Sequence, residues 1–174
     1  MLFGPLGSIH GDTVDVSYEA RYWYPDDGAI VWLEGYQLID AASGRYLARD
    51  AAQLQRAGLR VASVAGAARH HAEPLQSDAV APRRTLELRR DVANEHDANA
   101  IAVHAAGAEQ IGWIPRELAA TIAPELDAGT TWTAVALREA RRSPREPRNG
   151  LTMLLAPTDR IALHVHDPRP PARA

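Results

Sequence analysis

The sequence of 174 residues contains no cysteine and no lysine. Without cysteine the chain can form no disulfide, has no thiol nucleophile and cannot bind a metal through thiolates. All 19 basic residues are therefore arginine. Without lysine the chain cannot form the phosphate-binding loop of a P-loop ATPase, and it cannot be an enzyme that forms a Schiff base through lysine.

Long apolar runs and a strong positive charge are also missing. The longest apolar runs, such as residues 151–157, are far shorter than the roughly 18 residues of a membrane-spanning helix. The first residues do not show the basic and then apolar layout of a signal peptide, so we expect a cytoplasmic protein with no membrane partner. The formal net charge of −3 argues against nonspecific coating of nucleic acid, because that mode depends on neutralising phosphates.

The chain nevertheless has the composition of a folded protein, with 46% hydrophobic and 24% charged residues. Its first part contains three strand-like segments, residues 14–18, 20–24 and 29–39. The turn signal Pro25-Asp26-Asp27-Gly28 makes a hairpin of the last two. Residues 50–56 predict a short helix, since an aspartate precedes it and a glycine follows. We expect residues 1–58 to form a β-hairpin-rich N-terminal extension.

The rest of the chain alternates short strands with one secure helix. Strands are predicted at residues 59–64, 85–89, 100–104, 110–114, 132–137, 152–155 and 161–166. Pro115 is well placed as the first residue of a helix that ends before Gly129. Residues 66–82 are predicted to be a long surface loop, and residues 167–174 a disordered tail. Many short strands with one or two helices favour a mainly β (α+β) fold built on a small, partly open barrel.

Two blocks of sequence resemble those of a known family. Residues 94–103 read Asn-Glu-His-Asp-Ala-Asn-Ala-Ile-Ala-Val, and residues 111–119 read Ile-Gly-Trp-Ile-Pro-Arg-Glu-Leu-Ala. They resemble the HIRAN domain, whose pattern includes Asn-Pro-Tyr-Asp-x-Asn-Ala-Ile-x-Val and then Val-Gly-Tyr/His-Ile-Pro/Lys-Arg/Lys-Glu-Leu-Ala. The resemblance covers residues 59–166 and implies an OB-like or SH3-like barrel. Two positions depart from the pattern, because Glu95 replaces the proline and His96 replaces the tyrosine.

The resemblance also implies a function. HIRAN domains recognise single-stranded DNA 3′ ends, or damaged or stalled DNA, on behalf of a helicase or nuclease. We therefore expect a noncatalytic DNA-binding module for DNA repair, with the helicase or nuclease acting in trans. The expected contact with that partner is the set of aromatic side chains of the extension, Tyr22, Trp23, Tyr24, Trp32 and Tyr36.

The first candidate residues for DNA binding are Asn94, His96 and Asp97. A site for a free 3′ end needs an acceptor for the hydroxyl, a donor for the phosphate and a flat surface for the last base. Asp97 would accept from the hydroxyl and reject a 3′-phosphate, Asn94 would bond sugar or phosphate, and His96 would stack on a base. The alternative is an Asx-type turn in which Asp97 and Asn99 bond their own backbone.

Five further residues complete the candidate nucleic-acid-binding set. Arg69, His70 and His71 lie where family members place basic and aromatic side chains, and an arginine can both stack on a base and pair with phosphate. The alternative is a solvated loop. Arg116 would contact a phosphate at the start of a helix, where free amides favour anions. Trp113 would offer a stacking platform, or would pack in the core instead.

An arginine-rich run lies near the C-terminus, at Arg138, Arg141, Arg142, Arg145 and Arg148. It predicts either a solvated loop or a phosphate-binding edge.

The histidines carry no pattern of a zinc site or of a catalytic triad. These histidines are His10, His70, His71, His96, His104, His164 and His166. We expect no metal, no cofactor and no catalytic residue. Two alternatives stay open. One is a protein-interaction scaffold that has lost DNA binding, which His96 and the negative net charge favour. The other is a zinc-dependent hydrolase acting on nucleic acid or nucleotides, which would need a ligand cluster from distant loops.

Overall fold

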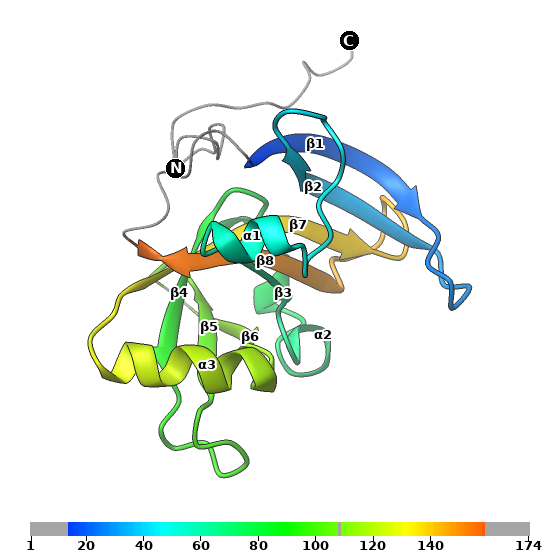
Figure 1. Ribbon diagram of the computed structural model, residues 1–174. Helices are drawn as coiled ribbons and strands as arrows, with labels where there is room; N and C mark the ends of the chain where they lie inside the picture. The colour runs from blue at the N-terminus through cyan, green and yellow to red at the C-terminus, as the bar shows by residue number, and fades with distance from the viewer. Residues whose placement is uncertain (1–13, 108, 159–174) are drawn as a thin grey trace.

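The computed structural model describes residues 14–107 and 109–158, so the strand predicted at 161–166 and the tail at 167–174 lie outside the described residues. One antiparallel sheet of eight strands dominates the fold (Figure 1). The strands are β1 (Val14–Trp23), β2 (Val31–Asp40), β3 (Arg60–Ser63), β4 (Thr85–Arg90), β5 (Ile101–Ala105), β6 (Gln110–Trp113), β7 (Trp132–Arg141) and β8 (Gly150–Pro157). The helices are α1 (Ala52–Arg56), α2 (Ala67–His70) and α3 (Arg116–Asp127).

The strand β7 joins the parts of the sheet. The strand order is β1-β2-β7-β4-β5-β6, while β8 pairs with both β7 and β3. All of these pairs are antiparallel, and the order ends at β1 and β6 without closing. The predicted mainly β fold with a partly open barrel is therefore confirmed.

Two hydrophobic cores lie on opposite faces of β7 and β8. Side chains alternate across a strand, so Ala134 and Ala136 face the inner core, which includes Ile101, Val103, Ile111, Ile122 and Met153. Val135 and Leu137 face the outer core, which includes Val16, Leu38, Leu54 and Leu59. The helix α3 covers the inner core with Ala119, Ile122 and Ala123. The hairpin β1–β2 and the helix α1 provide the outer core (Figure 1).

The N-terminal extension is continuous with the barrel. The two strands predicted at 14–18 and 20–24 are one strand, β1, which pairs along its whole length with β2. The strand β2 pairs in turn with β7 through residues 32–35. Tyr36 was expected at a partner surface, but it is fully buried, with 0% exposure. Tyr22, Trp23 and Tyr24 are exposed.

The prediction of a long surface loop at residues 66–82 is wrong. The segment contains α2 and two short 3₁₀ helices, η2 (Pro74–Gln76) and η3 (Asp78–Val80). Leu75 and Val80 are buried in the inner core. The helical turns were not predicted because such short turns have no apolar periodicity. The segment is held by a distant residue, Arg148, which donates hydrogen bonds to the carbonyl oxygens of Leu75 and Ser77.

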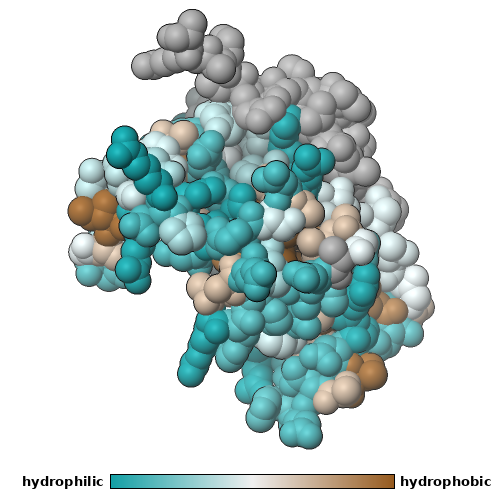
Figure 2. Space-filling model, turned by 180° about the vertical axis from the view of Figure 1, so that it is seen from behind, coloured by the Kyte–Doolittle hydropathy of each residue, from teal (hydrophilic) through white to brown (hydrophobic). Residues whose placement is uncertain are grey.

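The helix predicted from Pro115 begins at Arg116, with Pro115 in the preceding cap position. Among the described residues, no helix combines the length and the apolar character needed to cross a membrane. The face seen in Figure 2 is mostly hydrophilic, with apolar residues in small separate patches.

Candidate nucleic-acid interface

The end of β6 lies against the segment that precedes α2. The backbone of Trp113 exchanges two hydrogen bonds with that of Ala65, at 2.8 and 2.9 Å. This close approach requires glycine at position 112, because a Cβ there would lie 2.4 Å from the carbonyl oxygen of Ala65. The φ of Gly112 is 151°, which also favours glycine. The backbone thus places Trp113 beside α2.

Trp113 packs against both histidines of the α2 region. The ring centroid of His71 lies 5.1 Å from that of Trp113, and the centroid of His70 lies 6.1 Å away, both in edge-to-face geometry. His70 is exposed, whereas His71 and Trp113 are half-buried. The result is an aromatic cluster that is open on one side.

Burial lowers the pKa of His71 below its ordinary value, and the nearby charges of His70 and His104 lower it further. His71 is therefore neutral near neutral pH and packs on Trp113 as an aromatic ring. Its Nε2 atom is buried and makes no hydrogen bond with any residue that the structure describes.

Asp91 connects this aromatic cluster to the loop between β4 and β5. Its carboxylate accepts hydrogen bonds from the Nε1 of Trp113 at 3.1 Å and from the Nδ2 of Asn94 at 3.0 Å. The bond from Asn94 and then that from Trp113 hold the pKa of Asp91 below its ordinary value. The carboxylate is thus ionised at neutral pH and fixes the ring of Trp113.

The loop of residues 91–100 is held by its own side chains. The Oδ1 of Asn94 accepts from the backbone N–H groups of His96 and Asp97, at 3.0 and 3.1 Å. The Oδ1 of Asp97 accepts from the N–H of Asn99 at 2.9 Å. The bond of Asp97 is the Asx-type bond expected as the alternative to DNA contacts, whereas the second residue that makes such bonds is Asn94 and not the expected Asn99. Asn94 and Asp97 therefore shape the loop.

Arg116 joins the loop to the start of α3. Its Nη2 donates to the carbonyl oxygen of His96, and its Nε lies 3.6 Å from the Oδ2 of Asp97. The Arg116 side chain is nevertheless 71% exposed. The imidazole of His96 and the guanidinium of Arg69 are exposed and bond no other side chain in the described ranges.

The structure brings the eight candidate residues to one surface. Seven of them are linked by the contacts given above, and Arg69 belongs to the same short helix as His70. Sequence reasoning missed Asp91, which directly follows the predicted strand at residues 85–89 and Arg90. It also missed Arg90, which donates to the carbonyl oxygens of Ala98 and Ala100 and pairs with Asp127 of α3.

A family model of the HIRAN domain matches residues 58–153, which is more than half of the chain. The chain belongs to the HIRAN domain family. A HIRAN domain is generally a DNA-binding module.

Two solved structures are similar to this HIRAN protein. The crystal structure of the HIRAN domain of human HLTF has 22% sequence identity and a TM-score of 0.42, over 60% of this chain and 80% of that chain. The crystal structure of a protein from Lactobacillus plantarum has 21% identity and a TM-score of 0.41, over 55% and 89% of the two chains. No curated protein matches the sequence.

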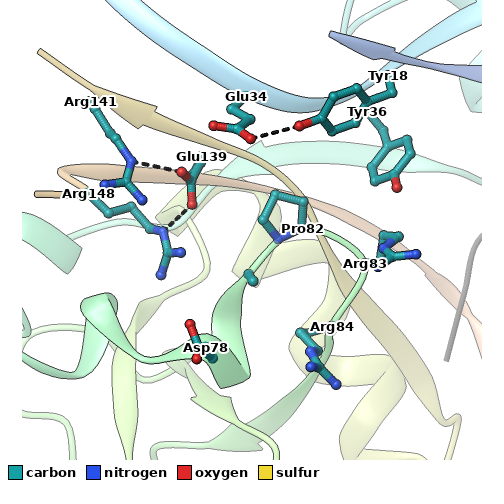
Figure 3. A pocket seen from close by; sticks show the side chains of 11 residues that line it. Tyr18, Glu34, Tyr36, Asp78, Pro82, Arg83, Arg84, Glu139, Arg141 and Arg148 are labelled. Atoms are coloured by element: carbon teal, nitrogen blue, oxygen red, sulfur yellow. Dashed lines mark hydrogen bonds and ion pairs between the residues drawn. The ribbon is translucent and has the colours of Figure 1, made fainter. Parts of the chain in front are cut away.

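The arginine-rich run of this HIRAN protein is not a single loop. Arg138 and Arg141 belong to β7, and Arg148 is buried. Arg148 and Arg141 share the carboxylate of Glu139, at 2.5 and 2.8 Å (Figure 3). These side chains line a polar pocket of about 360 Å³ between the hairpin and the segment of residues 78–84. Arg141 and Arg148 are thus occupied by contacts within the protein.

No group of three or more acidic or histidine side chains is placed to hold a metal ion in the part of the chain that the structure describes. His10, His164 and His166 lie outside the described residues. The geometry therefore gives the hydrolase alternative no support from residues 14–107 and 109–158.

Proposed function

We propose that this HIRAN protein binds single-stranded DNA and holds a 3′ end on the surface around Trp113. The observation that carries the proposal is an aromatic cluster whose indole is held by Asp91, together with two exposed guanidinium groups, that of Arg69 next to His70 on α2 and that of Arg116 beside the loop. Guanidinium groups suit phosphates, and aromatic rings suit unstacked bases. Both requirements of single-strand binding meet on one surface.

Each exposed side chain has a role in this proposal. Arg69 and Arg116 contact phosphates of the strand. His70 and the open edge of Trp113 receive the terminal base, and His96 contacts the next one. Asp91, Asn94 and the Asx-type turn keep these groups in place before the DNA arrives, which limits the entropy lost on binding.

The carboxylate of Asp97 favours a hydroxyl end. Its side chain keeps 20% exposure between Arg116 and the loop backbone, so it can accept one further hydrogen bond. A terminal hydroxyl can donate that bond, whereas a terminal phosphate brings negative charge toward the carboxylate. The protein acts in this proposal as a binding module and not as an enzyme, and it presents the bound end to a helicase or nuclease in trans.

Fluorescence anisotropy with matched oligonucleotides ending in a 3′-hydroxyl or a 3′-phosphate tests the proposal. We expect tighter binding of the hydroxyl end and weaker binding as salt rises. Asp97→Asn keeps an acceptor for the Asn99 N–H and removes the charge, so it should bring the two affinities close together. Arg69→Gln and Arg116→Gln should each reduce the slope of log affinity against log salt by about 1.

Arg145→Gln is the matched control, because Arg145 is exposed on the turn between β7 and β8 and is absent from the contacts described above. It should leave the end preference unchanged. Equal binding of both ends by the wild type would contradict 3′-end recognition. No binding of any oligonucleotide at low salt would favour the protein-interaction scaffold instead.

A further inference from the structure

We call the surface around Trp113, with Arg69, His70, His96, Asp97 and Arg116, the end-binding surface. Arg138 is a cation that is not part of it. It lies on β7 opposite Gly35 of β2, and its Nη1 donates to the carbonyl oxygen of Tyr36 at 3.3 Å. No carboxylate of the described residues forms an ion pair with it. Burial, together with the positive charges of Arg49 and Arg21, lowers the pKa of Arg138 to about 10.

The fold thus gathers three arginines, Arg21, Arg49 and Arg138, which we name the extension cluster. Glu19 is the carboxylate close to them, and it binds the Nε of Arg21 at 2.6 Å. Neighbouring like charges with partial burial oppose one another. An anion bound between them would offset this repulsion, and the excess positive charge makes the extension cluster a place for one.

Exposed aromatic rings flank the extension cluster. The guanidinium carbon of Arg21 lies 5.0 Å from the ring centroid of Trp23 and 5.7 Å from that of Tyr46. Trp23 is 45% exposed and Tyr46 is 58% exposed. Arginines that alternate with exposed aromatic rings are typical of surfaces that bind single-stranded nucleic acid.

A groove lies between residues 49–63 and the start of α3. It has a volume of about 510 Å³, and its lining includes Arg49 of the extension cluster and Pro115, the neighbour of Arg116. Ser63 of β3 also lines the groove. Ser63 and Arg138 of β7 pair with the same residue of β8, Thr152, from opposite sides, so this part of the groove lies two strands away from the extension cluster.

Charges inside the groove balance. Arg49 and Arg60 face Asp50 and Glu117 there, so the groove itself attracts a phosphate chain only weakly. Arg21 and Arg138 of the extension cluster are not in this lining, and against the charge of Glu19 they leave one positive charge in excess there.

We propose that a DNA strand whose 3′ end is held beside Trp113 continues through this groove onto the N-terminal extension. There the extension cluster contacts the phosphates, and Trp23 and Tyr46 stack with bases. The inference rests on the proposed function, since it assigns the path of the same strand. It gives the extension a role in binding DNA upstream of the end.

The test compares 3′-hydroxyl oligonucleotides of about 4 and about 12 nucleotides, the range of a single-strand site. For the full chain we expect the longer strand to bind roughly tenfold or more tightly, with a steeper salt dependence. The double variant Arg21→Gln, Arg49→Gln should reduce the salt slope for the long strand by about 2. It should leave binding of the short strand unchanged.

Trp23→Ala, which removes an exposed ring, should weaken binding of the long strand alone, by roughly tenfold. Arg56→Gln is the control, because Arg56 is exposed on α1 and does not line the groove. Circular dichroism establishes that each variant is folded.

The outcomes separate the two proposals. If the wild type binds short strands with no preference for a 3′-hydroxyl end, the result would contradict the proposed function but not the path over the extension. Two results would overturn the path over the extension. One is that Arg56→Gln has the same effect as the double variant. The other is that neither the double variant nor Trp23→Ala lowers the affinity for the long strand.

Discussion

At the scale of single residues, Asp91 is the group on which the geometry of the site depends. Hydrogen bonds from Asn94 and Trp113 hold its pKa below the model-compound value of 3.8. A carboxyl whose pKa is lowered by folding stabilises the folded state above its ordinary pKa, and this contribution is lost as pH falls through the lowered value. We therefore expect the contact between Asp91 and Trp113 to be intact from neutral pH to about pH 4 and to weaken below it.

The indole N–H resonance of Trp113, assigned with Trp113→Phe, reports this contact in an acid titration. In Asp91→Asn, which cannot titrate, the resonance should stay in place over the same pH range. The indole of Trp32 is an internal reference, because its Nε1 makes no hydrogen bond within the described part of the chain. A Trp113 resonance that moves alike in the wild type and in Asp91→Asn would contradict this role of Asp91.

Gly112 gives a second prediction at this scale. In Gly112→Ala the new Cβ meets the carbonyl oxygen of Ala65 at 2.4 Å, at a φ of 151°. We expect a loss of about 2 kcal/mol or more in the free energy of unfolding, measured with urea. Gly107→Ala is the matched control. Gly107 also has a positive φ, 72°, but a Cβ there would meet no atom of the described residues within 4 Å, chain neighbours aside. The substitution should therefore cost only about 1 kcal/mol.

The local bonds of the site could be predicted from the sequence, whereas its long-range bonds could not. The Asx-type bond of Asp97 was predicted, because it joins a side chain to a backbone N–H only two residues away, although the second such residue is Asn94 and not Asn99. The bond between Asp91 and Trp113 spans 22 residues. Only the pairing of β4, β5 and β6 brings them together, and no periodicity in the chain specifies such a contact.

At the scale of elements, Arg148 connects the segment of residues 74–80 to β7. Its guanidinium donates to Glu139 and to the carbonyl oxygens of Leu75 and Ser77. Removing Arg148 leaves the buried Glu139 with its ion pair to Arg141 and takes the donor away from two carbonyl oxygens. We expect Arg148→Met to lower the free energy of unfolding by about 3 kcal/mol in urea denaturation.

Arg89→Met is the control for that variant, because Arg89 and Glu87 form an exposed pair at 2.6 Å. Loss of an exposed pair should cost at most about 1 kcal/mol. Similar losses in the two variants would show that Arg148 does not hold the segment.

The same contact explains why this segment was predicted to be a loop. The carbonyl oxygens that accept hydrogen bonds from Arg148 lie 71 to 73 residues earlier in the chain. The segment that contains them, residues 74–80, has no repeating apolar pattern. The strands and α3 were predictable because alternation and helical spacing record which face is buried. Short helical turns that are held by a distant side chain have no such pattern in the sequence.

At the scale of the whole molecule, the N-terminal extension and the region of the HIRAN match share the outer hydrophobic core. The family match begins at residue 58, yet β7 and β8 bury side chains against the hairpin that precedes this boundary. Val135, Leu137 and Leu154 are among them. Burial of such a side chain contributes about 1.5–3 kcal/mol, so these three together contribute roughly 5–9 kcal/mol.

A fragment that begins at residue 59 should therefore not fold cooperatively. The contribution it loses is comparable with the whole stability of a domain, about 5–15 kcal/mol. We expect it to lack the single sharp urea transition of the full chain, and a peptide of residues 14–58 added in trans should restore that transition. A fragment that unfolds as sharply as the full chain, at a similar midpoint, would show that the outer core is dispensable. If instead the fragment fails, the role of the extension in DNA binding can be measured only with surface variants, because deletion would remove the barrel with it.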